Sequence, residues 1–175
     1  HMSRLATSRT NQDDRGAAIV EFALISGILI MLLLGTISAG LTISHNISLN
    51  NGAREAARFG ATLPVDSDIS SWLGNVADVA EQATNGDLGD ATPGQSICVA
   101  YVYPNGADAH DQTVSITETS GVRSTNVGAS CFADGRPATE RRVQISLQRQ
   151  SDIETGIFSH ELTLNATAIV RFERG

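Results

Sequence analysis

Residues 16–43 read GAAIVEFALISGILIMLLLGTISAGLTI, and this stretch decides how the whole chain is organised. Within it, residues 22–43 form a run of 22 positions without a charged side chain. At about 1.5 Å per residue, a helix of this length measures about 33 Å, enough to cross a hydrocarbon core of about 30 Å. The sequence therefore predicts a membrane-spanning helix close to the N-terminus.

One glutamate, Glu21, stands at the start of the uncharged run. An ionised carboxylate at the edge of a membrane-spanning segment is costly to bury and needs a partner. Ala17 lies four residues earlier, so the two residues share one face of a helix. A cut after Gly16 would give Ala17 an α-amine one helical turn from this carboxylate, or offer that amine to the carboxylate of a neighbouring copy. The arrangement resembles a pilin precursor.

Basic residues on the two flanks predict the orientation of the span. Three arginines precede the apolar run, and the first basic residue after it is Arg54. The positive-inside rule therefore places the N-terminus in the cytoplasm and residues 44–175 outside. The formal net charge of −7 argues against a nucleic-acid partner, because phosphate binding needs clustered basic residues.

The two cysteines, Cys98 and Cys131, both fall in the exported part of the chain. An even pair in an oxidising compartment predicts a disulfide. Closing a loop of roughly 34 residues would stabilise the fold by about 3–4 kcal/mol on the chain-entropy model. The alternative is a pair of buried thiols that do not form a bond.

The N-terminal helix is expected to start near Ala17 and to continue beyond the bilayer. Apolar residues recur at roughly helical spacing after the span, interleaved with polar and charged ones. Gly52 weakens this part by up to about 1 kcal/mol and allows a kink there. The helix should end at residues 60–63, because Pro64 disfavours an α conformation in the residue before it.

The remaining chain predicts a second helix followed by a sheet. Residues 68–84 carry apolar side chains at i, i+3, i+4 and i+7, and Asn85-Gly86 is a helix-stop signal. The candidate N-terminal caps are Asp66, Ser67 and Asp68. Alternation with a period of two then predicts four strands with one buried face, at residues 97–103, 114–116, 143–147 and 162–172. Residues 120–139 are expected to form the longest loop.

The expected fold class is α+β, with a long N-terminal helix, half of it transmembrane, and a second helix packed on a four-stranded antiparallel sheet. Residues 1–16 are expected to be a cytoplasmic leader that includes His1-Met2 as a cloning remnant. The other expected segments are a transmembrane helix at 17–43, its extracytoplasmic continuation at 44–63 and a globular domain at 64–175.

The motif around the predicted cut is more specific than this shape. Arg15-Gly16 followed by AAIVEF at residues 17–22 resembles the prepilin-peptidase site of the Tad (tight adherence, Flp) pilus, and GAREAARFGA at 52–61 resembles TadE-like pseudopilins. The resemblance implies cleavage after Gly16, Ala17 as the mature N-terminus and a role for Glu21 in assembly. It departs from the major Flp pilins at Phe22, where they carry Tyr, and in its greater length.

The resemblance implies a minor pilin or pseudopilin that helps initiate or assemble a Tad/Flp-type pilus, and TadE, TadF or another minor subunit fits it. It also implies, as partners, a prepilin peptidase, other minor pilins, the major Flp pilin and an inner-membrane assembly platform. The expected location is the bacterial inner membrane in a single pass, with incorporation into the pilus as an option. The alternatives are a cleaved secretory signal and an uncleaved membrane-anchored binding module.

Metal and catalytic chemistry find little support in the sequence. Two acidic clusters carry oxygens of the kind that calcium takes: Asp108, His110 and Asp111, and Asn85, Asp87 and Asp90. Turn chemistry explains both clusters, since Asp, Asn and Gly are the usual turn residues. The histidines lack HExxH-type spacing. We therefore expect no cofactor, no metal and no enzymatic activity.

Overall fold

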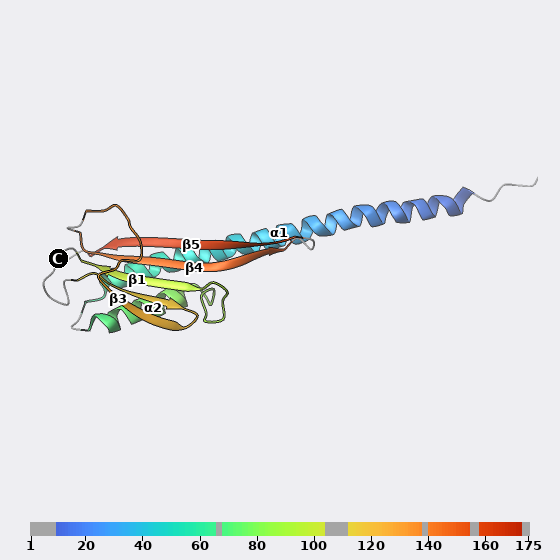
Figure 1. Ribbon diagram of the computed structural model, residues 1–175. Coiled ribbons are helices and arrows are strands. Elements are labelled where there is room, and N and C mark those ends of the chain that lie inside the picture. Colours follow the sequence, from blue (N-terminus) through green and yellow to red (C-terminus); the bar gives the residue numbers. More distant parts are fainter. Residues whose placement is uncertain (1–9, 66–67, 104–111, 138–139, 155–157, 173–175) are drawn as a thin grey trace, which may run out of the picture.

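A computed structural model describes residues 10–65, 68–103, 112–137, 140–154 and 158–172 of the chain (Figure 1). Its elements are α1 (Thr10–Thr62), α2 (Ile69–Ala83), β1 (Ser96–Val102), β2 (Val114–Thr119), β3 (Val122–Val127), β4 (Arg142–Glu154) and β5 (Ser159–Arg171). The strands form one antiparallel sheet in the order β3-β2-β1-β4-β5. The predicted α+β fold is confirmed, with five strands in place of four.

Helix α1 is continuous over 53 residues and serves two environments. Its first half projects away from the domain, and its second half lies against the sheet and α2 (Figure 1). It ends at Thr62, as predicted, but begins at Thr10 and so passes through Gly16. The earlier start has a simple reason: residues 10–15 contain no proline, and a nucleated helix extends one residue at a time at little cost.

Small side chains let the second half of α1 approach its neighbours closely. Ala53, Ala56 and Ala57 are completely buried. A Cβ atom on Gly52 would lie 2.5 Å from Cγ2 of Thr84, at the end of α2. Glycine at this position therefore permits a tight helix–helix contact, and α1 passes through it as one uninterrupted helix.

Helix α2 follows the predicted range closely. Asp68 is its N-cap and accepts a hydrogen bond from the backbone N–H of Ser70 at 3.1 Å. After the helix, Asn85 and Gly86 adopt φ values of 52° and 86°, the left-handed conformation that ends helices. The side chains that α2 buries in the core form the predicted stripe: Trp72, Leu73, Val76, Ala77 and Ala80.

The core lies between the two helices and one face of the sheet. Val99 of β1 pairs with Ile116 of β2 and Ile145 of β4, and all three side chains are buried. Trp72 of α2 contacts the ring of Tyr101 edge-on, with centroids 5.8 Å apart. This face contains the odd-numbered apolar residues of β1 and β4, as the alternation in the sequence predicts.

Strand β3 corrects the prediction of a single loop over residues 120–139. Ser120 and Gly121, with φ values of 50° and 76°, form a two-residue hairpin turn that pairs β3 with β2. All six residues of β3 are exposed, so the strand has no buried apolar alternation for the sequence to reveal. Arg123 instead holds it, through ion pairs with Glu118 of β2 and Asp78 of α2. These hydrogen bonds raise the pKa of Arg123.

Residues 131–134, which follow β3, are attached to the face of the sheet opposite the helices. The predicted disulfide joins Cys98 of β1 to Cys131, with Cα atoms 5.8 Å apart. Asp134 forms an ion pair with Arg142 at 2.6 Å and accepts a hydrogen bond from Gln144 at 2.8 Å. Burial acts to raise the pKa of Asp134, but these bonds outweigh it and lower the pKa to about 2.

Replacing Gly52 by alanine tests the close approach of α1 and α2. The new methyl group would collide with Thr84, and overpacking of this kind costs about 1–3 kcal/mol, more than the gain in helix propensity of about 1 kcal/mol. We expect Gly52→Ala to lower the thermal unfolding midpoint, measured by circular dichroism in detergent. A second change, Thr84→Ser, removes the colliding Cγ2 and should restore it.

Gly74→Ala is the matched control, since a Cβ there meets only Arg123 Nη1, at an ordinary 3.7 Å. This variant should be as stable as the wild type or slightly more stable. Equal effects of Gly52→Ala and Gly74→Ala would contradict the packing role of Gly52.

Candidate functional site: the N-terminal helix and its junction with the domain

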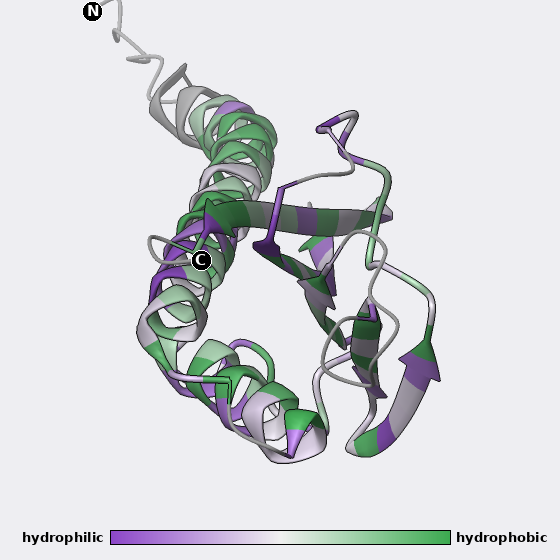
Figure 2. Ribbon diagram, turned by 90° about the vertical axis from the view of Figure 1, so that its left-hand side faces the viewer, coloured by the Kyte–Doolittle hydropathy of each residue, from purple (hydrophilic) through white to green (hydrophobic). Residues whose placement is uncertain are grey.

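The first half of α1 exposes a large apolar surface, and contact of such a surface with water is unfavourable. Its most apolar 18-residue window has a mean hydropathy of 2.6, and none of that window is buried. Phe22 is 72% exposed and Leu32 62% exposed. Figure 2 shows this half of the helix as almost continuously hydrophobic. Within the described residues, it is the one helix long and apolar enough to cross a membrane.

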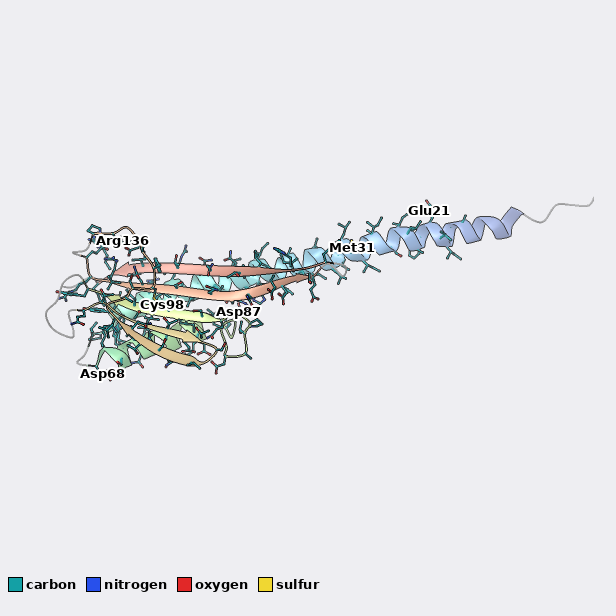
Figure 3. All side chains as sticks on the ribbon, in the orientation of Figure 1. Glu21, Met31, Asp68, Asp87, Cys98 and Arg136 are labelled. Atoms are coloured by element: carbon teal, nitrogen blue, oxygen red, sulfur yellow. A yellow bond between two sulfur atoms is a disulfide. The ribbon has the colours of Figure 1, made fainter. Side chains whose placement is uncertain are left out.

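Glu21 lies near the start of this surface, far from the domain (Figure 3), and Gly16 and Ala17 precede it on the same helix. Gly16 is exposed within α1, and a Cβ there would meet nothing within 4 Å apart from the helix's own backbone, so no other element covers this position. Glycine also weakens a helix by about 1 kcal/mol, which favours local opening at this point. Glu21 is exposed one turn beyond Ala17, and none of the described residues forms an ion pair with it.

The β4–β5 hairpin reaches furthest along α1 toward this free half (Figure 1). β1 begins at Ser96, opposite Gln148, so beyond Gln148 the two strands continue as a two-stranded ribbon. Such a ribbon is marginal by itself and needs another element to pack against. Here α1 supplies that support: Ser38 Oγ donates a hydrogen bond to the carbonyl oxygen of Glu154 at 2.9 Å. The domain therefore begins to cover α1 at Ser38.

Further along, a charged cluster ties three segments together. Asp87, after α2, lies 2.8 Å from Nδ1 of His45 on α1 and accepts a hydrogen bond from Nη1 of Arg149 on β4 at 3.0 Å. The same Nη1 donates to the Asp87 carbonyl at 3.2 Å. Figure 3 shows Asp87 at the end of the domain that faces the free half of α1. Nη1 of Arg149 also lies 3.1 Å from Nδ1 of His45, so the three side chains form one cluster that ties α1 to β4 and to the segment after α2.

These contacts form a polar seam between α1 and the domain, made of Ser38, Thr42, His45, Asp87, Arg149, Ser151 and Glu154. In its middle, the hydroxyl oxygens of Thr42 and Ser151 lie 3.2 Å apart and share a hydrogen bond. Beyond the seam, the interface turns apolar and begins with the fully buried Leu49. Hydrogen bonds therefore set the orientation near the free half, and close packing holds the far end.

Sequence reasoning did not predict the polar seam. It treated Asp87 as part of an acidic turn, whereas the structure uses this carboxylate in the seam. A signal was present, however, because Ser38, Thr42 and His45 follow the i, i+4, i+7 spacing of one helix face. Asn85 and Asp90 are exposed, and within the described ranges no three His, Cys, Asp or Glu side chains cluster as metal ligands would. The candidates Asp108, His110 and Asp111 lie outside those ranges.

The fold and this site define an α+β protein with a candidate membrane-spanning N-terminal helix, which carries the candidate processing and assembly residues. Residues 16–58 match the family model described as TadE-like protein. The resemblance expected from the sequence is therefore confirmed for this segment, which is similar to TadE-like proteins. Comparison with curated proteins and with solved structures gives no match.

Arg149→Met tests whether the polar seam holds the hairpin. The change removes the donor to Asp87 and leaves a half-buried carboxylate poorly satisfied, which costs about 1–3 kcal/mol. We expect faster hydrogen exchange of amides 149–154 in β4, with little change at the apolar end of α1. Mass spectrometry of the full chain in detergent would measure this.

Arg171→Met is the control, because the Arg171 side chain is 68% exposed and Glu140 keeps its second ion pair, with Arg136, when Arg171 is removed. If the two variants exchanged alike in residues 149–154, the polar seam would have no special role in holding the hairpin.

Proposed function

We propose that this protein is a minor pilin or pseudopilin of a Tad/Flp-type pilus, made as a precursor and cut by a prepilin peptidase after Gly16. One observation carries the proposal: Gly16, Ala17 and Glu21 stand at the exposed start of an apolar half-helix, inside the TadE-like segment. Its role is structural, not enzymatic.

The mechanism begins with the precursor in the inner membrane. Arginines before the span keep its leader in the cytoplasm and place the α+β domain outside. As long as the charged leader is attached, the helix cannot leave the bilayer without dragging these charges through hydrocarbon. Cleavage after Gly16 removes this barrier and creates the cationic amine of Ala17.

Assembly then uses the free half of α1. The carboxylate of Glu21 pairs with the Ala17 amine of a neighbouring subunit, so that two charges that are costly in an apolar bundle neutralise each other. Added Cβ atoms on Gly27 and Gly40 would meet nothing within 4 Å, so both positions are open to close approach by another helix. The partners are other minor pilins, the major Flp pilin and the assembly platform.

The second candidate is an uncleaved, membrane-anchored binding module. It is favoured by the edge strand β3, where Val122 and Val127 are 71% and 68% exposed beside unpaired backbone groups. N-terminal sequencing of protein expressed with its peptidase separates the two functions. The pilin proposal requires a mature chain that begins at Ala17, and the binding module requires an uncut chain.

Gly16→Leu should block cleavage, because the peptidase must accommodate a residue without a side chain at the cut. We expect full-length precursor in the membrane and loss of pili, measured by immunoblot and electron microscopy. Gly27→Leu is the matched control: its surroundings are equally open, so the variant should still be cut. Processing of Gly16→Leu at the wild-type rate would show that the cut lies elsewhere.

Glu21→Ala should separate assembly from insertion. Removing a carboxylate at the membrane edge leaves insertion intact, since even at a helix centre the charge costs only about 2.5–3.5 kcal/mol on insertion scales. The processed subunit should no longer co-purify with other pilins, because each Ala17 amine loses its counter-charge. Glu55→Ala, on the exposed part of α1 beyond the span, should assemble normally. Normal piliation in Glu21→Ala cells would refute the pairing mechanism.

A further inference from the structure

The distance from Glu21 to the domain is too short for a standard bilayer. The two positions at issue are Glu21, where the charge lies, and Ser38, where the hairpin first contacts α1. They are 17 residues apart, which is about 26 Å along a helix, and tilting the helix shortens the projection. A hydrocarbon core is about 30 Å thick. Therefore either the carboxylate lies inside the core or the hairpin enters the membrane interface.

The part of the hairpin that would enter is called here the hairpin tip: residues 151–154 of β4, Phe158, and residues 159–162 of β5. Ser151 contacts Thr42, so the side of the ribbon that includes Ser151 faces α1. Leu162 pairs with Ser151 and shares that side, as Ile153 does by alternation. This side therefore carries the apolar Ile153 and Leu162 together with Ser151 and with His160, which pairs with Ile153.

Large apolar side chains are exposed on both elements at this level. Phe158, directly before β5, is 73% exposed, and Leu162 is 38% exposed. On α1, Ile37 is 53% exposed and Leu41 is 57% exposed. An apolar rim around the point where a helix enters a membrane is the surface expected of a segment that lies at the lipid interface.

Acidic residues occupy the other side of the hairpin tip. Asp152 and Glu161 are paired across the strands, so both side chains point away from α1, and Glu154 lies on the same side by alternation. All three are exposed. Like charges directly opposite each other are unfavourable, and water screens them best. This side therefore limits how deep the hairpin tip can go, and it opposes contact with anionic headgroups.

We propose that the hairpin tip is a second membrane anchor, which inserts Phe158 and Leu162 beside α1 into the interface of the outer leaflet of the inner membrane. The proposal rests on the orientation given under the proposed function. It matches the short distance to Glu21, since the hairpin tip enters the interface and the carboxylate stays at the opposite surface. The partner is a bilayer with zwitterionic headgroups, because the acidic side repels anionic ones.

The test measures the depth of a tryptophan at position 158. The full chain with Phe158→Trp is reconstituted in vesicles of phosphatidylcholine brominated near the headgroup, and emission is compared with that in unbrominated vesicles. The native Trp72 is only 2% exposed, and the signal of the wild-type protein is subtracted. We expect a blue-shifted added emission that loses most of its intensity to bromine quenching. Replacing half of the lipid with unbrominated anionic lipid should reduce this loss by more than dilution of bromine alone.

Two matched variants make the outcome decisive. Val127→Trp, exposed on β3 at the opposite edge of the sheet, should not be quenched, and Leu29→Trp, within the free half of α1, should be quenched most by lipid brominated near the chain ends. If Leu29→Trp is quenched and Phe158→Trp behaves like Val127→Trp, the hairpin tip is not an anchor, although α1 spans the membrane. If neither is quenched, the membrane placement itself is wrong. A blue shift that disappears when lipid is added in excess would indicate contact with a second copy and would overturn the lipid assignment.

Discussion

The structure depends on one constraint: a single uninterrupted helix must satisfy two different surroundings. The first half of α1 exposes apolar side chains all around, whereas the second half buries one face of small residues in a protein core. One helix without interruption connects these halves, so the direction of the apolar half is fixed relative to the domain. Gly52 contributes to this arrangement, because it lets α1 pack closely against the end of α2 while remaining one continuous helix.

The polar seam solves the problem at the border between the two surroundings. Purely apolar packing would not distinguish the face of α1 that packs on the domain from the exposed apolar surface of its first half, because both would be hydrophobic. Hydrogen bonds at Ser38 and Thr42, together with the charged cluster around Asp87, are directional and fix one arrangement. These groups are partly buried, and in such surroundings a hydrogen bond is electrostatically stronger than in bulk water.

Elements that depend on local pattern followed the prediction. Helix α2, its cap at Asp68 and its stop at Asn85-Gly86 are confirmed, and so is the disulfide between Cys98 and Cys131. Within the sheet, two parts were missed. β3 has no buried alternation, and its only strong signal was the Ser120-Gly121 turn. The second miss was the end of the ribbon, residues 148–154 of β4 and 159–161 of β5, where the sequence is mostly polar and shows no clear period.

The sequence alone determined the candidate membrane span, its placement next to Gly16 and Glu21, and the TadE-like character of that segment. These properties are local, because the length of the apolar run, its hydropathy and the helical spacing depend only on consecutive residues. Only the tertiary structure decided where the domain meets the helix. Ser38 and Glu154 are 116 positions apart, and His45 and Arg149 are 104 apart. Such pairs form because the sheet brings distant segments together, and no local period encodes which polar groups will meet.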